Sequence, residues 1–177
     1  RIRQPRRKRR FGCAGSFPRA PPRQNGAISV PHDMRPRILL VDDQECILDL
    51  YQRILARAEP PSASDTSMPN GPPFRLEVYR QGDAALAAVQ AALRANDPFS
   101  VAFIDVRMPP GPDGYWTARE IRALDPMLQI VIATGFAEIN SAEIASHIPP
   151  IDRIRCVHKP LPLWEVRHLA ASLSEQC

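Results

Sequence analysis

The sequence predicts an α/β domain built on a parallel sheet of five strands, with helices on both faces of the sheet. Continuous apolar runs, typical of strands buried on both sides, alternate along the chain with segments whose apolar residues recur at helical spacing. Most of these apolar runs also end in a polar residue capable of chemistry.

Five segments have the pattern of strands. Three are nearly continuous apolar runs, one alternates as a strand near a sheet edge does, and the fifth carries Ile, Cys and Val among polar residues. In chain order they are RILLV (37–41), the alternating FRLEVY (74–79), FSVAFID (99–105), LQIVIAT (128–134) and IRCVHKP (154–160).

Helical spacing of apolar residues predicts a helix after each strand. Right-handed crossovers between parallel strands then lead to a doubly wound, flavodoxin-like sheet with the strand order 2-1-3-4-5. The five predicted helices run from residue 47 to about 58, 83–95, 115–124, 141–147 and 164–173.

The two ends of the chain differ in charge and in composition. The net charge is +4, yet residues 1–37 carry eleven basic residues and one acidic residue, so the remainder of the chain is acidic. Residues 1–36 also hold six prolines and little periodicity, which predicts a disordered basic tail ahead of a domain spanning 37–177. Within that domain, residues 59–73 are an extended loop by composition. An acidic body argues against specific nucleic-acid binding by the folded domain.

The four cysteines indicate a reducing compartment. They are scattered, with no spacing typical of metal ligands, and we therefore expect a cytoplasmic protein. Cys46 and Cys156 lie in apolar segments, where a free cysteine is expected to pack as a small hydrophobe. No apolar run is long enough to span a membrane, and no membrane partner is expected.

Three aspartates stand at the ends of predicted strands. Asp42 and Asp43 follow the first strand, and Asp105 ends the third. Because ligands of open α/β sheets bind outside the carboxyl ends of the strands, we expect these carboxylates to lie together. Their mutual repulsion is relieved by a hard divalent cation, and a few carboxylates with a carbonyl suit Mg²⁺.

Two further strand ends carry groups suited to binding a phosphoryl group. Lys159 is one of only two lysines in the chain, and the other lies in the basic tail. Its compact ammonium group can bridge a carboxylate and a phosphoryl oxygen as a point charge, which a planar guanidinium does poorly. Thr134 ends the fourth strand, where a hydroxyl can donate to a phosphoryl oxygen.

An acidic pair, an aspartate, a hydroxyl and a lysine in this order resemble the receiver domains of two-component response regulators. The resemblance covers about 37–175. Its motifs are VDD (41–43), FIDVRMPPGPDG (103–114), ATG (133–135) and HKP (158–160).

The resemblance implies a role for each site residue. Asp105 is the phosphoacceptor, Asp43 and Asp105 ligate Mg²⁺ directly, and Asp42 helps to place the ion. The backbone carbonyl of Arg107 supplies a further ligand. Two residues then bind the phosphoryl oxygens, namely Thr134 and Lys159.

The resemblance also implies partners. The phosphoryl donor is a phosphohistidine on a sensor histidine kinase or a histidine phosphotransfer protein, and receivers of this kind can form phosphorylation-dependent homodimers. The chain ends soon after its last predicted helix, so we expect output by protein contacts or from a larger hybrid kinase that includes this domain.

Two features that bear on the chemistry and its output depart from the usual receiver pattern. The loop after Asp105 is one residue longer, and Cys156 stands where many receivers carry a Tyr or Phe that reports phosphorylation. One alternative is a pseudo-receiver that binds proteins without phosphoryl transfer. Another is an aspartate-nucleophile phosphatase, which usually places a second acid at the position of Arg107 and is therefore disfavoured.

Overall fold

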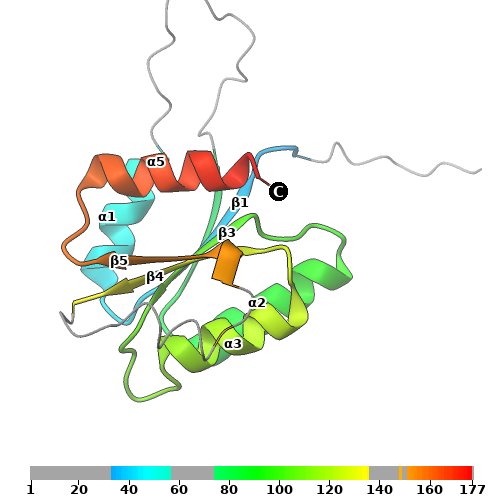
Figure 1. The fold of residues 1–177 in the computed structure, drawn as a ribbon, viewed down its shortest axis with the longest axis horizontal. Helices are drawn as coiled ribbons and strands as arrows, with labels where there is room; N and C mark the ends of the chain where they lie inside the picture. Colours follow the sequence, from blue (N-terminus) through cyan, green and yellow to red (C-terminus); the bar gives the residue numbers. More distant parts are fainter. Residues whose placement is uncertain (1–32, 57–73, 136–147, 149–150, 177) are drawn as a thin grey trace, which may run out of the picture. The chain divides into compact units, whose positions relative to one another are not determined.

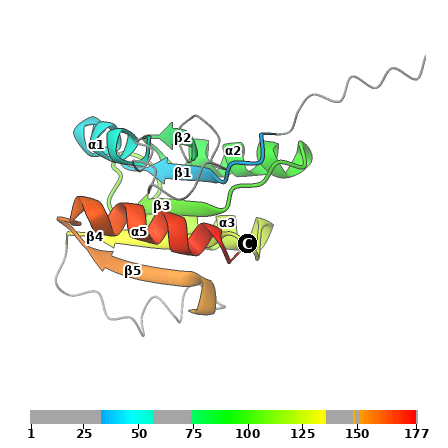
Figure 2. The same ribbon diagram turned by 90° about the horizontal axis from the view of Figure 1, so that it is seen from above.

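Five parallel strands form the centre of the structure. The structure is a computed structural model, and it describes residues 33–56, 74–135, 148 and 151–176. They lie side by side in the predicted order, with the second strand in sequence at one edge and the fifth at the other (Figure 2). The prediction of a five-stranded parallel sheet is confirmed. The strands are β1 (Arg37–Val41), β2 (Arg75–Tyr79), β3 (Val101–Asp105), β4 (Gln129–Thr134) and β5 (Ile154–His158).

Helices cover both faces of this sheet (Figure 1). The described helices are α1 (Glu45–Leu55), α2 (Gly82–Arg94), α3 (Gly114–Leu124), α5 (Leu163–Ser174) and the short 3-10 helix η1 (Ile151–Arg153). The pair α1 and α5 packs on one face, and the pair α2 and α3 packs on the other (Figure 1). The helix predicted at 141–147 lies outside the described residues.

Alternate residues of the central strands pack on opposite faces, because successive side chains of a strand point to opposite sides. On β1, Leu39 and Val41 pack in the core cluster that includes Ala85 of α2. Their neighbours Ile38 and Leu40 pack in the other cluster, under α1 and α5. This double burial is why the strand reads as a continuous apolar run.

The edge strands are less covered than the central strands. Every residue of β3 and β4 is buried, whereas β5 buries only Ile154 fully. Cys156, in the middle of β5, is exposed, and so is Cys46 in the first turn of α1. The expectation that both cysteines pack as small hydrophobes is therefore wrong.

No helix among the described residues is both long enough and apolar enough to cross a membrane. The predicted tail (1–36) and the predicted loop (59–73) fall almost wholly outside the described residues and stay predictions. Residues 34–177 form one compact unit.

Candidate phosphoryl and metal site

The carboxyl ends of four neighbouring strands carry the predicted site residues. β3 ends at Asp105 and β4 at Thr134, while Asp42 and Lys159 directly follow β1 and β5. Backbone hydrogen bonds continue past the strand ends: the Asp42 amide donates to Tyr79 O at 3.2 Å, and the Lys159 amide donates to Thr134 O at 2.7 Å. The sheet ladder itself thus holds these residues in register.

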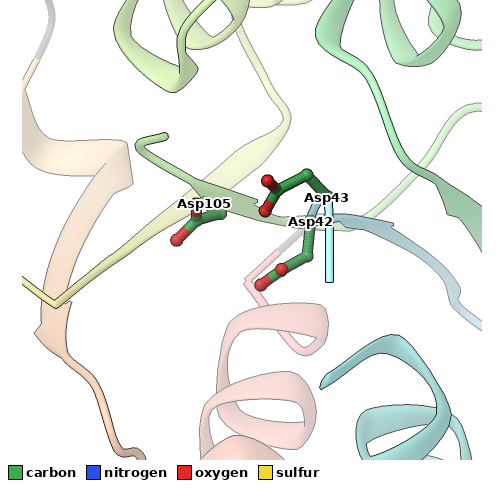
Figure 3. Close-up of side chains that lie close together, drawn as sticks. All are labelled: Asp42, Asp43 and Asp105. Carbon is green, nitrogen blue, oxygen red and sulfur yellow. The ribbon is translucent and has the colours of Figure 1, made fainter. Parts of the chain in front are cut away.

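The three aspartates form a compact carboxylate cluster (Figure 3). Asp42, Asp43 and Asp105 each have one carboxylate oxygen that lies within 4.8 Å of a carboxylate oxygen of the other two. Asp42 is 3% exposed and Asp105 is 7% exposed. Carboxylates this close and this buried repel one another unless a cation lies among them.

Lys159 supplies part of the required positive charge. Its Nζ atom lies 2.5 Å from Asp42 Oδ2 and 2.6 Å from Asp105 Oδ1. A single ammonium group therefore ties the end of β1 to the end of β3. The lysine side chain is 15% exposed, so solvent screens these contacts less than it would at the surface.

Burial and ion pairing shift the pKa values of Lys159 and Asp42. Burial alone would lower the pKa of Lys159, but its hydrogen bonds to Asp105 and Asp42 outweigh burial and raise the pKa. The ammonium form is therefore the form present at neutral pH. Burial also raises the pKa of Asp42, and the hydrogen bonds from Lys159 and from the Gln44 amide only partly offset it. For Asp42 the cost of burial thus exceeds the benefit of its bond to Lys159.

Asp43 has a buried oxygen without a hydrogen-bond partner. Its Oδ1 atom and Arg122 Nε are the buried side-chain polar atoms left unpartnered in the described part of the chain. A buried carboxylate oxygen without a donor is costly, and a bound cation would satisfy it. The three carboxylates, one of which holds this unpartnered oxygen, form a donor set that fits Mg²⁺.

The site opens as a cleft of about 300 Å³. The predicted site residues Asp43, Asp105, Arg107, Thr134 and Lys159 all line it. The cleft is large enough for a cation with some of its waters and a phosphoryl group beside it.

The backbone holds Asp105 tightly. The Arg107 amide donates to Asp105 Oδ2 at 2.9 Å, which orients the carboxylate. A Cβ atom at Gly114 would lie 2.1 Å from the backbone oxygen of Asp105, so only glycine fits there without moving Asp105. Sequence reasoning used Gly114 only as part of a motif and missed this role.

Known structures share the fold. No family model matches the sequence, and no curated protein matches it. A CheY-like response regulator receiver domain protein from Methanospirillum hungatei matches with TM-score 0.57 and 21% identity, over 80% of this chain and 96% of that chain. The chain has the receiver fold.

Two further matches have the same character. A response regulator receiver protein from Sinorhizobium medicae matches with TM-score 0.58 and 24% identity, over 80% of this chain and 96% of that chain. A signal receiver domain of an HD domain-containing protein from Pseudomonas fluorescens matches with TM-score 0.57 and 23% identity, over 80% and 88%. At such identities the receiver fold is shared, while the chemistry must be argued from the site itself.

Proposed function

We propose that this domain is a phosphoacceptor in a two-component phosphorelay, with Asp105 receiving the phosphoryl group. The observation that carries the proposal is the bridge from Lys159 Nζ to Asp42 and Asp105, beside the unpartnered oxygen of Asp43. With all four groups ionised, this cluster carries a net negative charge, which a bound cation would balance. With the cation in place, the Lys159 ammonium group and the Thr134 hydroxyl are suited to contact a phosphoryl group. By analogy with the solved receiver structures, the shared fold also supports this chemistry.

Mg²⁺ is the cofactor that the site residues suit best. Asp43 and Asp105 would hold the ion directly, Asp42 would help to place it, and the backbone carbonyl of Arg107 would add a ligand. When bound, the ion neutralises negative charge that develops on the transferring phosphoryl group. The unpartnered Asp43 Oδ1 supports this assignment.

The chain's own groups account for the transfer. A carboxylate oxygen of Asp105 attacks the phosphorus of a phosphohistidine on a sensor histidine kinase or a phosphotransfer protein. The P–N bond breaks, and its electron pair stays with the imidazole nitrogen. Lys159 balances charge on the phosphoryl oxygens, while the Thr134 hydroxyl donates a hydrogen bond to one of them. Positioning and electrostatics supply most of the catalysis.

Output then proceeds through changed protein contacts. Thr134 is 2% exposed and ends β4 next to the β5 edge, so a hydroxyl that turns toward a new phosphoryl group would alter this side of the domain. A homodimer formed on phosphorylation is one such contact. We place these events in the cytoplasm, because the four cysteines are scattered without the spacing of a disulfide framework or metal site.

The test is Mg²⁺-dependent labelling with acetyl phosphate, followed by intact-protein mass spectrometry. We expect the parent chain to gain one phosphoryl group and Asp105→Asn to gain none. Asp49→Asn is the matched control, because Asp49 is an exposed aspartate on α1. It should be labelled like the parent. An unlabelled parent, or equal labelling of Asp105→Asn, would instead support the pseudo-receiver alternative.

A further inference from the structure

The side chain of Gln81 clamps the loop that follows Asp105. Gln81 precedes α2, and its Nε2 atom donates to Pro109 O at 3.3 Å. Its Oε1 atom accepts from the Gly111 amide at 3.0 Å. Because a carbonyl can only accept and a backbone N–H can only donate, the two bonds together set the orientation of the carboxamide.

This clamp joins parts of the fold that are not neighbours in the sheet. β1 lies between β2 and β3, so Gln81 reaches past the end of β1 to the loop after β3. The preceding residue, Arg80, donates from Nη2 to the backbone oxygen of Asp43 at 3.0 Å. Two successive residues at the end of β2 thus hold the two loops that carry the proposed metal ligands.

The clamped loop needs such support. It runs from Val106 to Asp113 and is closed at its base by the Gly114 amide, which donates to Val106 O at 2.9 Å. Arg107, whose carbonyl is the proposed metal ligand, lies between that base and the clamp. The loop is also one residue longer than the usual receiver loop, which the proposed chemistry alone does not explain.

Gly111 is matched to Gln81. A Cβ atom added at Gly111 would lie 2.1 Å from Gln81 Oε1 and 3.2 Å from its Cδ atom. Any side chain at position 111 would therefore push the carboxamide away from the loop. The clamp depends on a glutamine at one position and a glycine at the other.

Simple stabilisation of the fold is a weaker explanation for these contacts. The Gln81 side chain makes no capping hydrogen bond to α2. Both of its bonds to the loop lie at the exposed surface, where a hydrogen bond exchanges with water at little net gain. What the clamp does limit is the freedom of the loop before the ion binds.

We propose that Gln81 is a positioning residue, which holds the loop so that the Arg107 carbonyl faces the bound cation. The proposal rests on the proposed function, because it assumes that Asp42, Asp43 and Asp105 hold Mg²⁺. It assigns a role to a residue outside the receiver motifs.

The first measurement is Mg²⁺ affinity by isothermal titration calorimetry, together with the thermal midpoint. We expect Gln81→Ala to weaken Mg²⁺ binding roughly tenfold, the lower end of the range for loss of a group that supports a metal ligand, because Gln81 acts on Arg107 only through the loop. Without Mg²⁺, its thermal midpoint should match that of the parent. Gln90→Ala, which removes a half-buried glutamine from α2, is the matched control and should bind like the parent. Equal affinity for the parent and Gln81→Ala overturns the inference.

A double-mutant cycle sharpens the test. Gly111→Ala alone should weaken Mg²⁺ binding about as much as Gln81→Ala, because the new methyl group displaces the carboxamide. The double variant should be no weaker than either single variant, since one clamp can be lost only once. Fully additive losses would mean that the two residues act separately, which also overturns the inference.

The outcomes separate this inference from the proposed function. A parent that binds Mg²⁺ and accepts a phosphoryl group, with Gln81→Ala unchanged in affinity, overturns the positioning role alone. A parent that binds Mg²⁺ more tightly than Gln81→Ala but accepts no phosphoryl group overturns the proposed function alone.

The Gly111 amide resonance, followed by NMR without Mg²⁺, should shift in Gln81→Ala and not in Gln90→Ala.

Discussion

The two ends of the sheet each carry a charged cluster, and the clusters differ in balance. At the amino end, Arg37 pairs with Glu77 and Asp97, and Arg75 pairs with Asp97 at 2.7 Å. Two positive charges thus meet two negative charges. The Arg37 guanidinium also lies 4.2 Å from the centre of the Phe99 ring. At this end, every charge of the cluster has a partner within the fold.

At the carboxyl end, the cluster of Asp42, Asp43, Asp105 and Lys159 carries three negative charges and one positive charge when all four groups are ionised. It is also the more buried cluster, since the side chains of Asp42 and Asp105 are 4% and 8% exposed, against 27% for Asp97. A charged group without enough hydrogen-bond or ion-pair partners destabilises the fold more, the more deeply it is buried. The amino-end cluster is thus balanced within the fold, whereas the carboxyl-end cluster has the net negative charge that the proposed cation site requires.

Removal of the one ammonium group at the carboxyl end should have the largest effect. Without Mg²⁺, we expect Lys159→Met to lower the free energy of unfolding by about 3 kcal/mol, because two buried carboxylates lose their shared cation and keep only backbone amide donors. Phosphoryl uptake should fall at least about a hundredfold. Urea denaturation in EDTA and acetyl phosphate labelling measure the two effects.

Saturating Mg²⁺ should return part of the stability that Lys159→Met loses, because the cation also relieves carboxylate repulsion. A variant as stable as the parent in EDTA would mean that the Lys159 bridge contributes nothing net. The comparison between the two ends of the sheet would then lose its basis.

Asp43→Asn separates charge balance from ligand binding. Without Mg²⁺ this variant should be at least as stable as the parent, because it removes one of three mutually repelling carboxylates. With Mg²⁺ at a hundred times the parent's Kd, the parent should gain about 2.7 kcal/mol, and Asp43→Asn should gain far less. Thermal denaturation with and without EDTA checks both signs. Equal Mg²⁺ stabilisation of the two proteins would exclude Asp43 from the metal site.

The sequence was sufficient to predict that the polar residues at the strand ends lie together at one edge of the sheet. The buried strands β1, β3 and β4 leave a clear apolar signal, and their ends place Asp42, Asp105 and Thr134 at one edge of the sheet. Lys159 was identified for a chemical reason, since it is the one lysine outside the basic tail. These predictions depend on the strand pattern, which is encoded locally, and on the strand order, which the right-handedness of the crossovers restricts.

Contacts that depend on loop geometry could not be predicted in the same way. Gln81 follows an edge strand and looks like any polar residue at a helix start, yet it reaches a loop 28 residues later. The prediction that Cys46 and Cys156 are packed in the core was also wrong. An apolar neighbourhood in sequence does not show which side of a helix is covered or how far an edge strand is exposed. Distances across loops are decided by tertiary packing, which no local pattern reports.

A smaller effect should follow disruption of the amino-end cluster. We expect Arg37→Met to lower the free energy of unfolding by about 2 kcal/mol, through loss of its bonds to Asp97 and Glu77 and of its contact with Phe99. The loss is limited because Glu77 is 38% exposed and can turn to solvent. Arg53→Met, an exposed arginine on α1, is the control and should cost much less. Mg²⁺ affinity and phosphoryl uptake should match the parent in both variants, because no ligand enters the balanced cluster. If Arg37→Met weakened Mg²⁺ binding as strongly as it lowered stability, the two ends of the sheet would be coupled, and the separation between a structural cluster and a functional one would fail.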